Sequence, residues 1–135
     1  MDSLEIADSV RAKKSSRPRL VLPVGDPAGV GIEVTLQALN DSEVTKNCDV
    51  TVIGDRAQLI EHYEQLNPET QKYTHPNKLS VIDVGSSGSI TIGTGNAISG
   101  KASFDYLEKA IARTLAGEFE AIVTAPIAKS AWKAA

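Results

Sequence analysis

The stretch LVLPVGDPAGVGIE, residues 20–33, decides the fold. It opens with an uninterrupted apolar run, which is typical of a strand covered on both faces in a parallel sheet. A glycine-rich turn follows over residues 25–31. A helical apolar stripe comes next, at Ile32, Thr35, Leu36 and Leu39. The stretch therefore predicts a strand, a tight turn and a helix, in that order.

The same alternation continues along the chain. Three further apolar runs predict strands at residues 50–53, 79–84 and 121–124. Helical stripes lie between these runs, and the clearest one carries on one face Phe104, Leu107, Ile111 and Leu115. Gly117 follows that stripe as the candidate C-cap. We predict an α/β fold, a parallel or mixed sheet with helices on both faces.

The two ends of the chain predict different behaviour. Residues 1–18 are rich in Lys and Arg and poor in apolar groups, which predicts a flexible basic tail. Residues 129–135 begin a helix that has a single large apolar side chain, Trp132, and no cap. Because the central strands of a parallel sheet need neighbours on both sides, we expect residues 19–135 to be the N-terminal part of an α/β domain that is truncated at its C-terminus.

Composition excludes several classes of protein. The 135 residues carry 14 Lys and Arg against 17 Asp and Glu, a net charge of −3, which disfavours a nucleic-acid partner held by bulk positive charge. No apolar run approaches the roughly 20 residues of a membrane helix. The single cysteine, Cys48, and the absence of a signal-like segment predict a cytoplasmic protein. His62 and His75 have no ligand partner at metal-binding spacing, and we expect both to be exposed.

The turn at residues 25–31 is the strongest candidate site. It joins a strand to a helix, where α/β proteins present backbone N–H groups to anions. Asp26 could accept a hydrogen bond from a hydroxyl or amine, so the candidate cofactor-binding residues are Asp26, Gly29 and Gly31. The glycine order differs from the dinucleotide fingerprint G-x-G-x-x-G, and Pro27 removes one N–H donor. The alternative is a glycine turn that only lets strand and helix pack.

Three other positions carry weaker candidates. Asp55 lies where a ribose-binding carboxylate could lie, but a helix cap is favoured. Residues 95–102 nearly spell a P-loop, yet Ala102 replaces the required hydroxyl, which favours a solvated Lys101 at a helix entry. Thr124 and Lys129 follow the last strand and are candidate substrate-binding residues for a phosphate or carboxylate. Their alternative is an ordinary strand-end threonine and a surface lysine.

Taken together and in this order, several motifs resemble the 4-hydroxythreonine-4-phosphate dehydrogenase family of vitamin B6 biosynthesis. They are residues 22–33, 52–55, 99–102, 117–119 and 122–127. The resemblance covers about residues 19–135. It implies an incomplete portion of the isocitrate/isopropylmalate dehydrogenase-like fold.

The resemblance also implies a chemistry. Members of that family use NAD or NADP and a divalent metal ion to oxidise 4-phosphooxy-L-threonine, whose 3-oxo acid then loses CO₂, and they act as homodimers. The metal would polarise the reacting hydroxyl. The family's metal-binding histidines and phosphate-gripping residues follow the segment that this chain matches, so its catalytic residues stay unknown and metal ligands are absent.

Residue 128 departs from the family pattern, because Ala128 replaces the asparagine often found before the lysine that matches Lys129. We expect the chain alone to be inactive. The alternatives are a phosphate- or nucleotide-binding module, a decayed remnant without catalysis, and a dehydrogenase of a related phosphorylated sugar acid.

Overall fold

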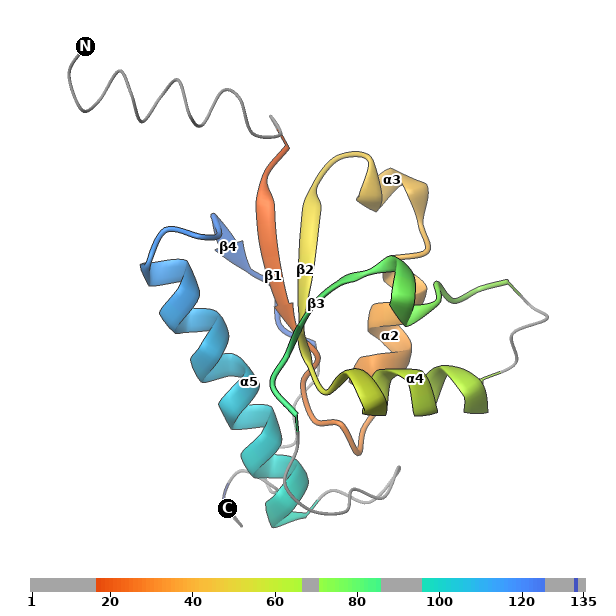
Figure 1. Cartoon of the computed structure of the whole chain (residues 1–135), viewed down its shortest axis with the longest axis vertical. Coiled ribbons are helices and arrows are strands. Elements are labelled where there is room, and N and C mark those ends of the chain that lie inside the picture. The colour runs from red at the N-terminus through yellow and green to blue at the C-terminus, as the bar shows by residue number, and fades with distance from the viewer. Residues whose placement is uncertain (1–16, 67–70, 86–95, 126–132, 134–135) are drawn as a thin grey trace.

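The computed structural model describes residues 17–66, 71–85, 96–125 and 133 (Figure 1). In chain order the elements are β1 (Arg19–Pro23), α2 (Gly31–Ala38), α3 (Ser42–Thr45), β2 (Asp49–Gly54), α4 (Arg56–Gln65), the 3₁₀ turn η2 (Pro76–Lys78), β3 (Ser80–Asp83), α5 (Ala97–Leu115) and β4 (Ala121–Ile122). The predicted alternation of strands and helices is confirmed. The helix predicted at residues 129–135 lies outside the described residues, apart from position 133.

The strands form one parallel sheet in the order β3-β2-β1-β4. β1 is central, with Leu20 opposite Val50 of β2 on one side and opposite Ala121 of β4 on the other. Parallel strands need crossover connections, and the helices between the strands supply them. The predicted α/β class with a parallel sheet is therefore confirmed.

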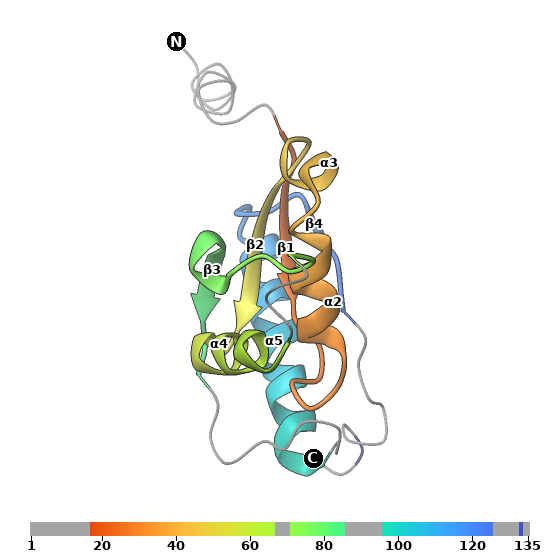
Figure 2. The same cartoon turned by 90° about the vertical axis from the view of Figure 1, so that its right-hand side faces the viewer.

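Helices cover both faces of this sheet. α2 and α4 lie on one side of the strands and α5 on the other, as Figure 1 shows edge-on and Figure 2 shows after a quarter turn. One apolar core runs through these layers, made of Val21, Val24, Ile32, Leu36, Leu39, Val52, Ile53, Leu59, Ala102, Tyr106 and Ala110. Because both faces of β1 and β2 are covered, their sequences are continuous apolar runs rather than alternating ones.

Three of the four residues of the apolar stripe predicted for α5 lie on the outer side of that helix, and the fourth, Leu107, is half-buried. Phe104 is 47% exposed, Ile111 42% and Leu115 83%, whereas Tyr106 and Ala110 are buried against the sheet. At about 100° of rotation per residue, Phe104 and Tyr106 point roughly 160° apart. α5 therefore has apolar side chains on two opposite faces.

Local hydrogen bonds end α5 just before the turn that leads into β4. Gly117 has a φ of +90°, its N–H donates to the Thr114 carbonyl at 3.0 Å, and the Glu118 N–H donates to the Arg113 carbonyl at 3.1 Å. This pair of bonds is the Schellman motif, so the prediction that Gly117 ends the helix is confirmed.

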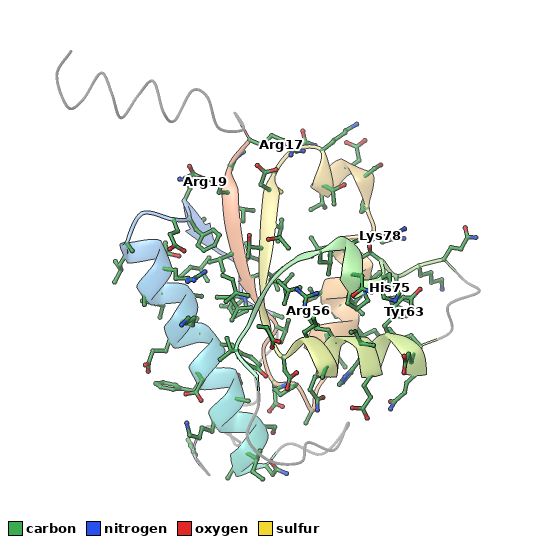
Figure 3. The ribbon with its side chains drawn as sticks, viewed as in Figure 1. Arg17, Arg19, Arg56, Tyr63, His75 and Lys78 are labelled. Carbon is green, nitrogen blue, oxygen red and sulfur yellow. The ribbon has the colours of Figure 1, made fainter. Side chains whose placement is uncertain are left out.

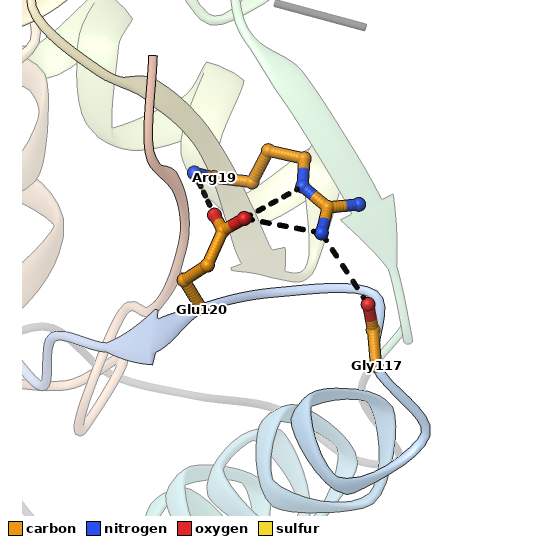
Figure 4. A network of polar contacts seen from close by, with 3 residues as sticks. All are labelled: Arg19, Gly117 and Glu120. Carbon is orange, nitrogen blue, oxygen red and sulfur yellow. Dashed lines mark hydrogen bonds and ion pairs between the residues drawn. The ribbon is translucent and has the colours of Figure 1, made fainter. Parts of the chain in front are cut away.

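An ion pair then ties the turn after α5 to the start of β1. The Arg19 guanidinium donates to Glu120 Oε1 at 3.2 Å and to the Gly117 carbonyl at 3.4 Å (Figure 4). The Arg19 backbone N–H also donates to the Glu120 carboxylate. The strand that opens the domain is thus held directly against the turn that leads into β4.

Two expectations for polar residues are modified. The prediction that His62 is exposed was wrong: it is buried, with Nδ1 2.9 Å from the Gln58 carbonyl oxygen. It lies three residues after the core residue Leu59, so both point inward from α4. His75 is half-buried, and its ring meets Tyr63 edge-on with centroids 4.6 Å apart (Figure 3).

At the start of the chain, most of the predicted tail lies outside the described residues. Arg17 is described, and it forms an ion pair with Asp49 and donates to the Thr45 carbonyl at 2.9 Å. In the part of the chain that the structure describes, no helix has both the length and the apolar character to cross a membrane.

Candidate ligand site at the carboxyl ends of β1 and β4

The candidate residues gather where the strand order reverses. From β1 the chain proceeds to β2 and β3 on one side and then crosses back to β4 on the other, so β1 and β4 flank a topological switch point. In open α/β sheets, ligands bind outside the carboxyl ends of the strands at such a point. The loop after β1 and the end of β4 lie at this same edge (Figure 1).

The loop at residues 25–31 folds back on Asp26. Gly25 has a φ of +75°, which starts the turn. Asp26 is only 2% exposed, and its Oδ1 accepts from the Ala28 N–H at 2.8 Å. The Gly29 N–H donates to the Asp26 carbonyl at 2.9 Å. The carboxylate that we predicted to meet a ligand therefore holds the turn together.

Ser99 connects this loop to α5 across 73 positions of sequence. Its hydroxyl lies 3.3 Å from Asp26 Oδ2 and also accepts from the Asn96 N–H at 3.0 Å. Asn96 Oδ1 in turn accepts from the Ser99 N–H at 3.0 Å, which completes a capping box at the start of α5. The sequence predicted a helix entry at residues 95–102 but no role for either residue, although the pattern Asn-x-x-Ser before an apolar helix was a signal for the cap.

Gly31 is required by packing. A Cβ at this position would lie 2.0 Å from the Val24 carbonyl oxygen and 3.4 Å from the Ala125 Cβ. The first turn of α2 therefore lies directly on the end of β1. Gly29 is different, because it is exposed and, among the described residues, an added Cβ would meet only Asp26, at 3.5 Å or more. The packing alternative explains Gly31 and leaves Gly29 as a surface position.

Thr124 lies beside the end of β1. The Val123 N–H donates to the Val21 carbonyl at 3.0 Å and the Ala125 N–H to the Pro23 carbonyl at 3.3 Å, so residues 123–125 continue along β1 beyond β4. Thr124 is exposed. The structure thus brings together Thr124 and the 25–31 loop, while Lys129 lies outside the described residues.

The strands β2 and β3 also end in aspartates, which bind backbone N–H groups. Asp55 Oδ1 accepts from Ala57 at 2.9 Å and from Gln58 at 3.3 Å, so the predicted cap of α4 is confirmed. Asp83 Oδ1 accepts from the N–H groups of Arg56 at 3.2 Å and Gly85 at 3.1 Å. These carboxylates fix the loops that follow the strands.

Tyr106 lies beneath this acidic edge. Burial raises the pKa of its phenol, and the negative charges of Asp55 and Asp83 raise it further. In the described part of the chain, its buried hydroxyl has no hydrogen-bond partner. A hydrogen bond to Glu33, together with burial, likewise raises the pKa of Tyr73. Both phenols therefore stay neutral at physiological pH.

Neither a P-loop nor a metal site is supported by this geometry. Residues 97–102 lie within α5, so they form a helical turn rather than a loop that could cradle phosphate, and Lys101 is exposed and pairs with Asp105 at 3.0 Å. Among the described residues, no group of three or more His, Cys, Asp or Glu side chains could hold a metal ion. This part of the chain does not fit the divalent ion that the family resemblance implies.

Comparison with known proteins agrees with the motifs. A family model described as pyridoxal phosphate biosynthetic protein PdxA matches residues 46–135. The chain is 49% identical over 141 residues to the 4-hydroxythreonine-4-phosphate dehydrogenase of Nostoc sp., covering 100% of this chain and 39% of that protein. It is 51% identical over 125 residues to the protein of the same name from Synechocystis sp., covering 89% and 36%.

A more distant relative has a different name. A putative D-threonate 4-phosphate dehydrogenase from Clostridium botulinum is 35% identical over 127 residues, covering 85% of this chain and 38% of that protein. The chain thus spans about two fifths of the length of the curated relatives it matches.

Solved structures give the same picture. The 4-hydroxythreonine-4-phosphate dehydrogenase from Burkholderia phymatum superposes with a TM-score of 0.72 at 28% identity, covering 89% of this chain and 39% of that one. The enzyme from Klebsiella pneumoniae gives 0.74 at 25% identity, covering 89% and 40%. The fold is therefore the dehydrogenase-like α/β fold of these proteins.

Proposed function

This chain belongs to the PdxA family of pyridoxal phosphate biosynthetic proteins, and we propose that it supplies the cofactor-side segment of an NAD- or NADP-dependent dehydrogenase that oxidises 4-phosphooxy-L-threonine. The observation that carries the proposal is the 49% identity, over the whole of this chain, to the dehydrogenase of Nostoc sp.. The match spans the 25–31 loop, Asp55 and the segment around Thr124.

The proposal assigns binding, rather than chemistry, to the described residues. Gly29 and Thr124 are exposed at the switch point, where they would contact the ligand, and the buried Asp26 and Gly31 would orient it by fixing the shape of the loop. Lys129 stays a predicted substrate contact. A bound nicotinamide supplies the acceptor for the hydride that leaves the alcohol carbon of the substrate. Because the described residues do not fit a metal ion, no step is assigned to one. A cytoplasmic, homodimeric enzyme is part of the same proposal.

A chimeric enzyme tests this assignment. The whole chain replaces the matched segment of the Nostoc dehydrogenase, and oxidation of 4-phosphooxy-L-threonine is followed through the absorbance of the reduced nicotinamide. We expect activity with NAD or NADP. A chimera that folds and dimerises like its parent but produces no reduced cofactor would contradict the proposal. This chain by itself is the negative control.

A second candidate differs only in substrate. The 35% identity to the protein from Clostridium botulinum favours D-threonate 4-phosphate as the alternative. Because that identity is lower than the 49% with Nostoc sp., we place it second. The Nostoc chimera should be assayed with both substrates, and a higher kcat/KM for D-threonate 4-phosphate than for 4-phosphooxy-L-threonine would reverse this order.

A further inference from the structure

We infer that Asp26 is a specificity-determining residue that closes the 25–31 loop to phosphate groups. The part of a ligand that lies against this loop is then uncharged or cationic and bears hydroxyl or amino groups. The inference rests on the proposed function only for the identity of that ligand, a nicotinamide nucleotide. The exclusion of phosphate follows from the geometry of the loop itself.

The first observation is that the N–H groups in the middle of the loop, at positions 27–29, are absent or already used. A phosphate site at a strand-to-helix turn depends on backbone N–H groups that point out toward the anion. Pro27 has no N–H. The Ala28 N–H donates to Asp26 Oδ1 at 2.8 Å, and the Gly29 N–H donates to the Asp26 carbonyl at 2.9 Å. At three consecutive positions, the loop therefore offers no donor to an incoming phosphate.

The second observation is the charge of Asp26. Its carboxylate is 2% exposed, and its partners in the described structure are neutral groups, the Ala28 N–H and the Ser99 hydroxyl. Burial weakens the screening of that charge by water. A Cβ built on Gly29 would lie 3.9 Å from the Asp26 Cβ, so a phosphate resting on Gly29 would lie close to the carboxylate. Repulsion between the two anions excludes it.

The third observation concerns the groups at the switch point that remain accessible to a ligand. Gly29 and Thr124 are exposed on the two sides of the switch point. They offer peptide groups and one hydroxyl, which suit the hydroxyls of a ribose or the amide of a nicotinamide ring. The negative field of Asp26 also favours the cationic ring of an oxidised nicotinamide. The phosphates of a nucleotide then lie away from the loop.

Amide NMR of the whole chain tests the inference. The probes are inorganic pyrophosphate and nicotinamide riboside, a cation without phosphate, and the reporters are the amides of Gly29 and Thr124. In the wild-type chain we expect the riboside to shift these amides and pyrophosphate to leave them in place. If pyrophosphate shifts them at lower concentration than the riboside, or if the riboside shifts neither, the inference is wrong.

A charge-removing variant gives the second arm. Asp26→Asn keeps an oxygen for the Ala28 N–H and removes the charge, so pyrophosphate should bind at the loop about tenfold more tightly or better. Ser99→Ala is the matched control, because this substitution removes the contact with Asp26 but leaves the negative charge of Asp26 in place. Pyrophosphate should bind this variant as it binds the wild type. An equal gain in Ser99→Ala, or no gain in Asp26→Asn, overturns the inference. The titration of the wild-type chain tests the inference even if Asp26→Asn does not fold. Neither the wild-type titration nor the comparison of variants depends on the activity of the chimera.

Discussion

Replacing Gly31 by alanine tests whether α2 really lies in direct contact with β1. The added Cβ would be 2.0 Å from the Val24 carbonyl oxygen and 3.2 Å from its carbonyl carbon. Both atoms are backbone of Val24, which directly follows β1 and whose N–H donates to the Ile53 carbonyl of β2 at 3.1 Å, so neither can rotate away as a side chain could. The first turn of α2 must move by more than about 1 Å to restore a normal contact.

Such a displacement has a cost that can be bounded. Overpacking a well-packed site typically destabilises a protein by about 1–3 kcal/mol, occasionally more. Here the clash is with rigid backbone, so we expect the upper end, about 3 kcal/mol. The helix propensity of alanine over glycine offsets less than about 1 kcal/mol of this. The net change should lower the midpoint of urea unfolding by about 1–2 M.

Urea titration followed by far-UV circular dichroism measures this change. Gly29→Ala is the matched control, because Gly29 is exposed and its added Cβ would lie 3.5 Å or more from every atom of the described residues. We expect the control to stay within about 0.5 kcal/mol of the wild type. If Gly31→Ala unfolds at the same urea concentration as the control, α2 does not lie against β1 as described.

Three further predictions follow from other contacts. Asp55→Ala should lower the free energy of unfolding by about 1 kcal/mol, whereas Asp55→Asn should retain most of it, because both Asp and Asn accept the N-cap hydrogen bonds; equal losses in urea titrations would contradict the cap. Because the pKa of Tyr106 is raised in the fold above its ordinary value of 10.0, its contribution to stability is complete below that pH and is lost as the pH rises through the folded pKa. Tyr106→Phe should therefore be neutral or stabilising at pH ~7, since the buried hydroxyl has no partner in the described structure. Between pH ~9 and pH ~11 the variant should lose less stability than the wild type, because phenylalanine does not titrate. A loss as large as that of the wild type would refute this prediction. Leu115→Lys should reduce concentration-dependent self-association in sedimentation velocity, because Leu115 is the most exposed member of the outer apolar face of α5. The control Gln65→Lys, which adds the same charge on α4, should not reduce it. Equal behaviour of the two variants would mean that this face of α5 does not drive self-association.

The sequence predicts the strands well because their signal is local. A buried parallel strand is a short apolar run, and the runs at residues 20–24 and 50–53 need no long-range information to be found. The cap at Asp55 is local in the same way. Sequence motifs likewise suffice for the family, since the residues around the 25–31 loop occur in a fixed order with the later ones.

The orientation of α5 could not be predicted from its pattern. Periodicity reports which face of a helix carries large apolar groups, and in α5 that face carries Phe104, Ile111 and Leu115. The face that meets the sheet is instead lined by Tyr106 and small residues such as Ala102 and Ala110, which let the helix approach closely. A pattern of side-chain sizes does not say which of two apolar faces meets a given layer.

The candidate site was only partly predictable for a related reason. The loop and Thr124 were found because each follows a strand. The contact between Asp26 and Ser99 joins residues 73 positions apart, and no local signal indicates that the Ser99 hydroxyl also reaches Asp26. Because of this contact, we assign Asp26 the role of shaping the loop rather than the predicted role of contacting a ligand.

The central place of β1 has a consequence for the order of folding. Its pairing with β2 joins positions 20 and 50, while its pairing with β4 joins positions 20 and 121 over only two residues of strand. Closing the longer loop costs about 1 kcal/mol more chain entropy and returns fewer backbone hydrogen bonds. During synthesis, β1, β2 and β3 can assemble with α2 and α4 before β4 has left the ribosome. We therefore expect α5 and β4 to dock last during folding and to open first in hydrogen exchange. The edge of β1 that pairs with β4 would then become exposed during these openings more often than the edge that pairs with β2.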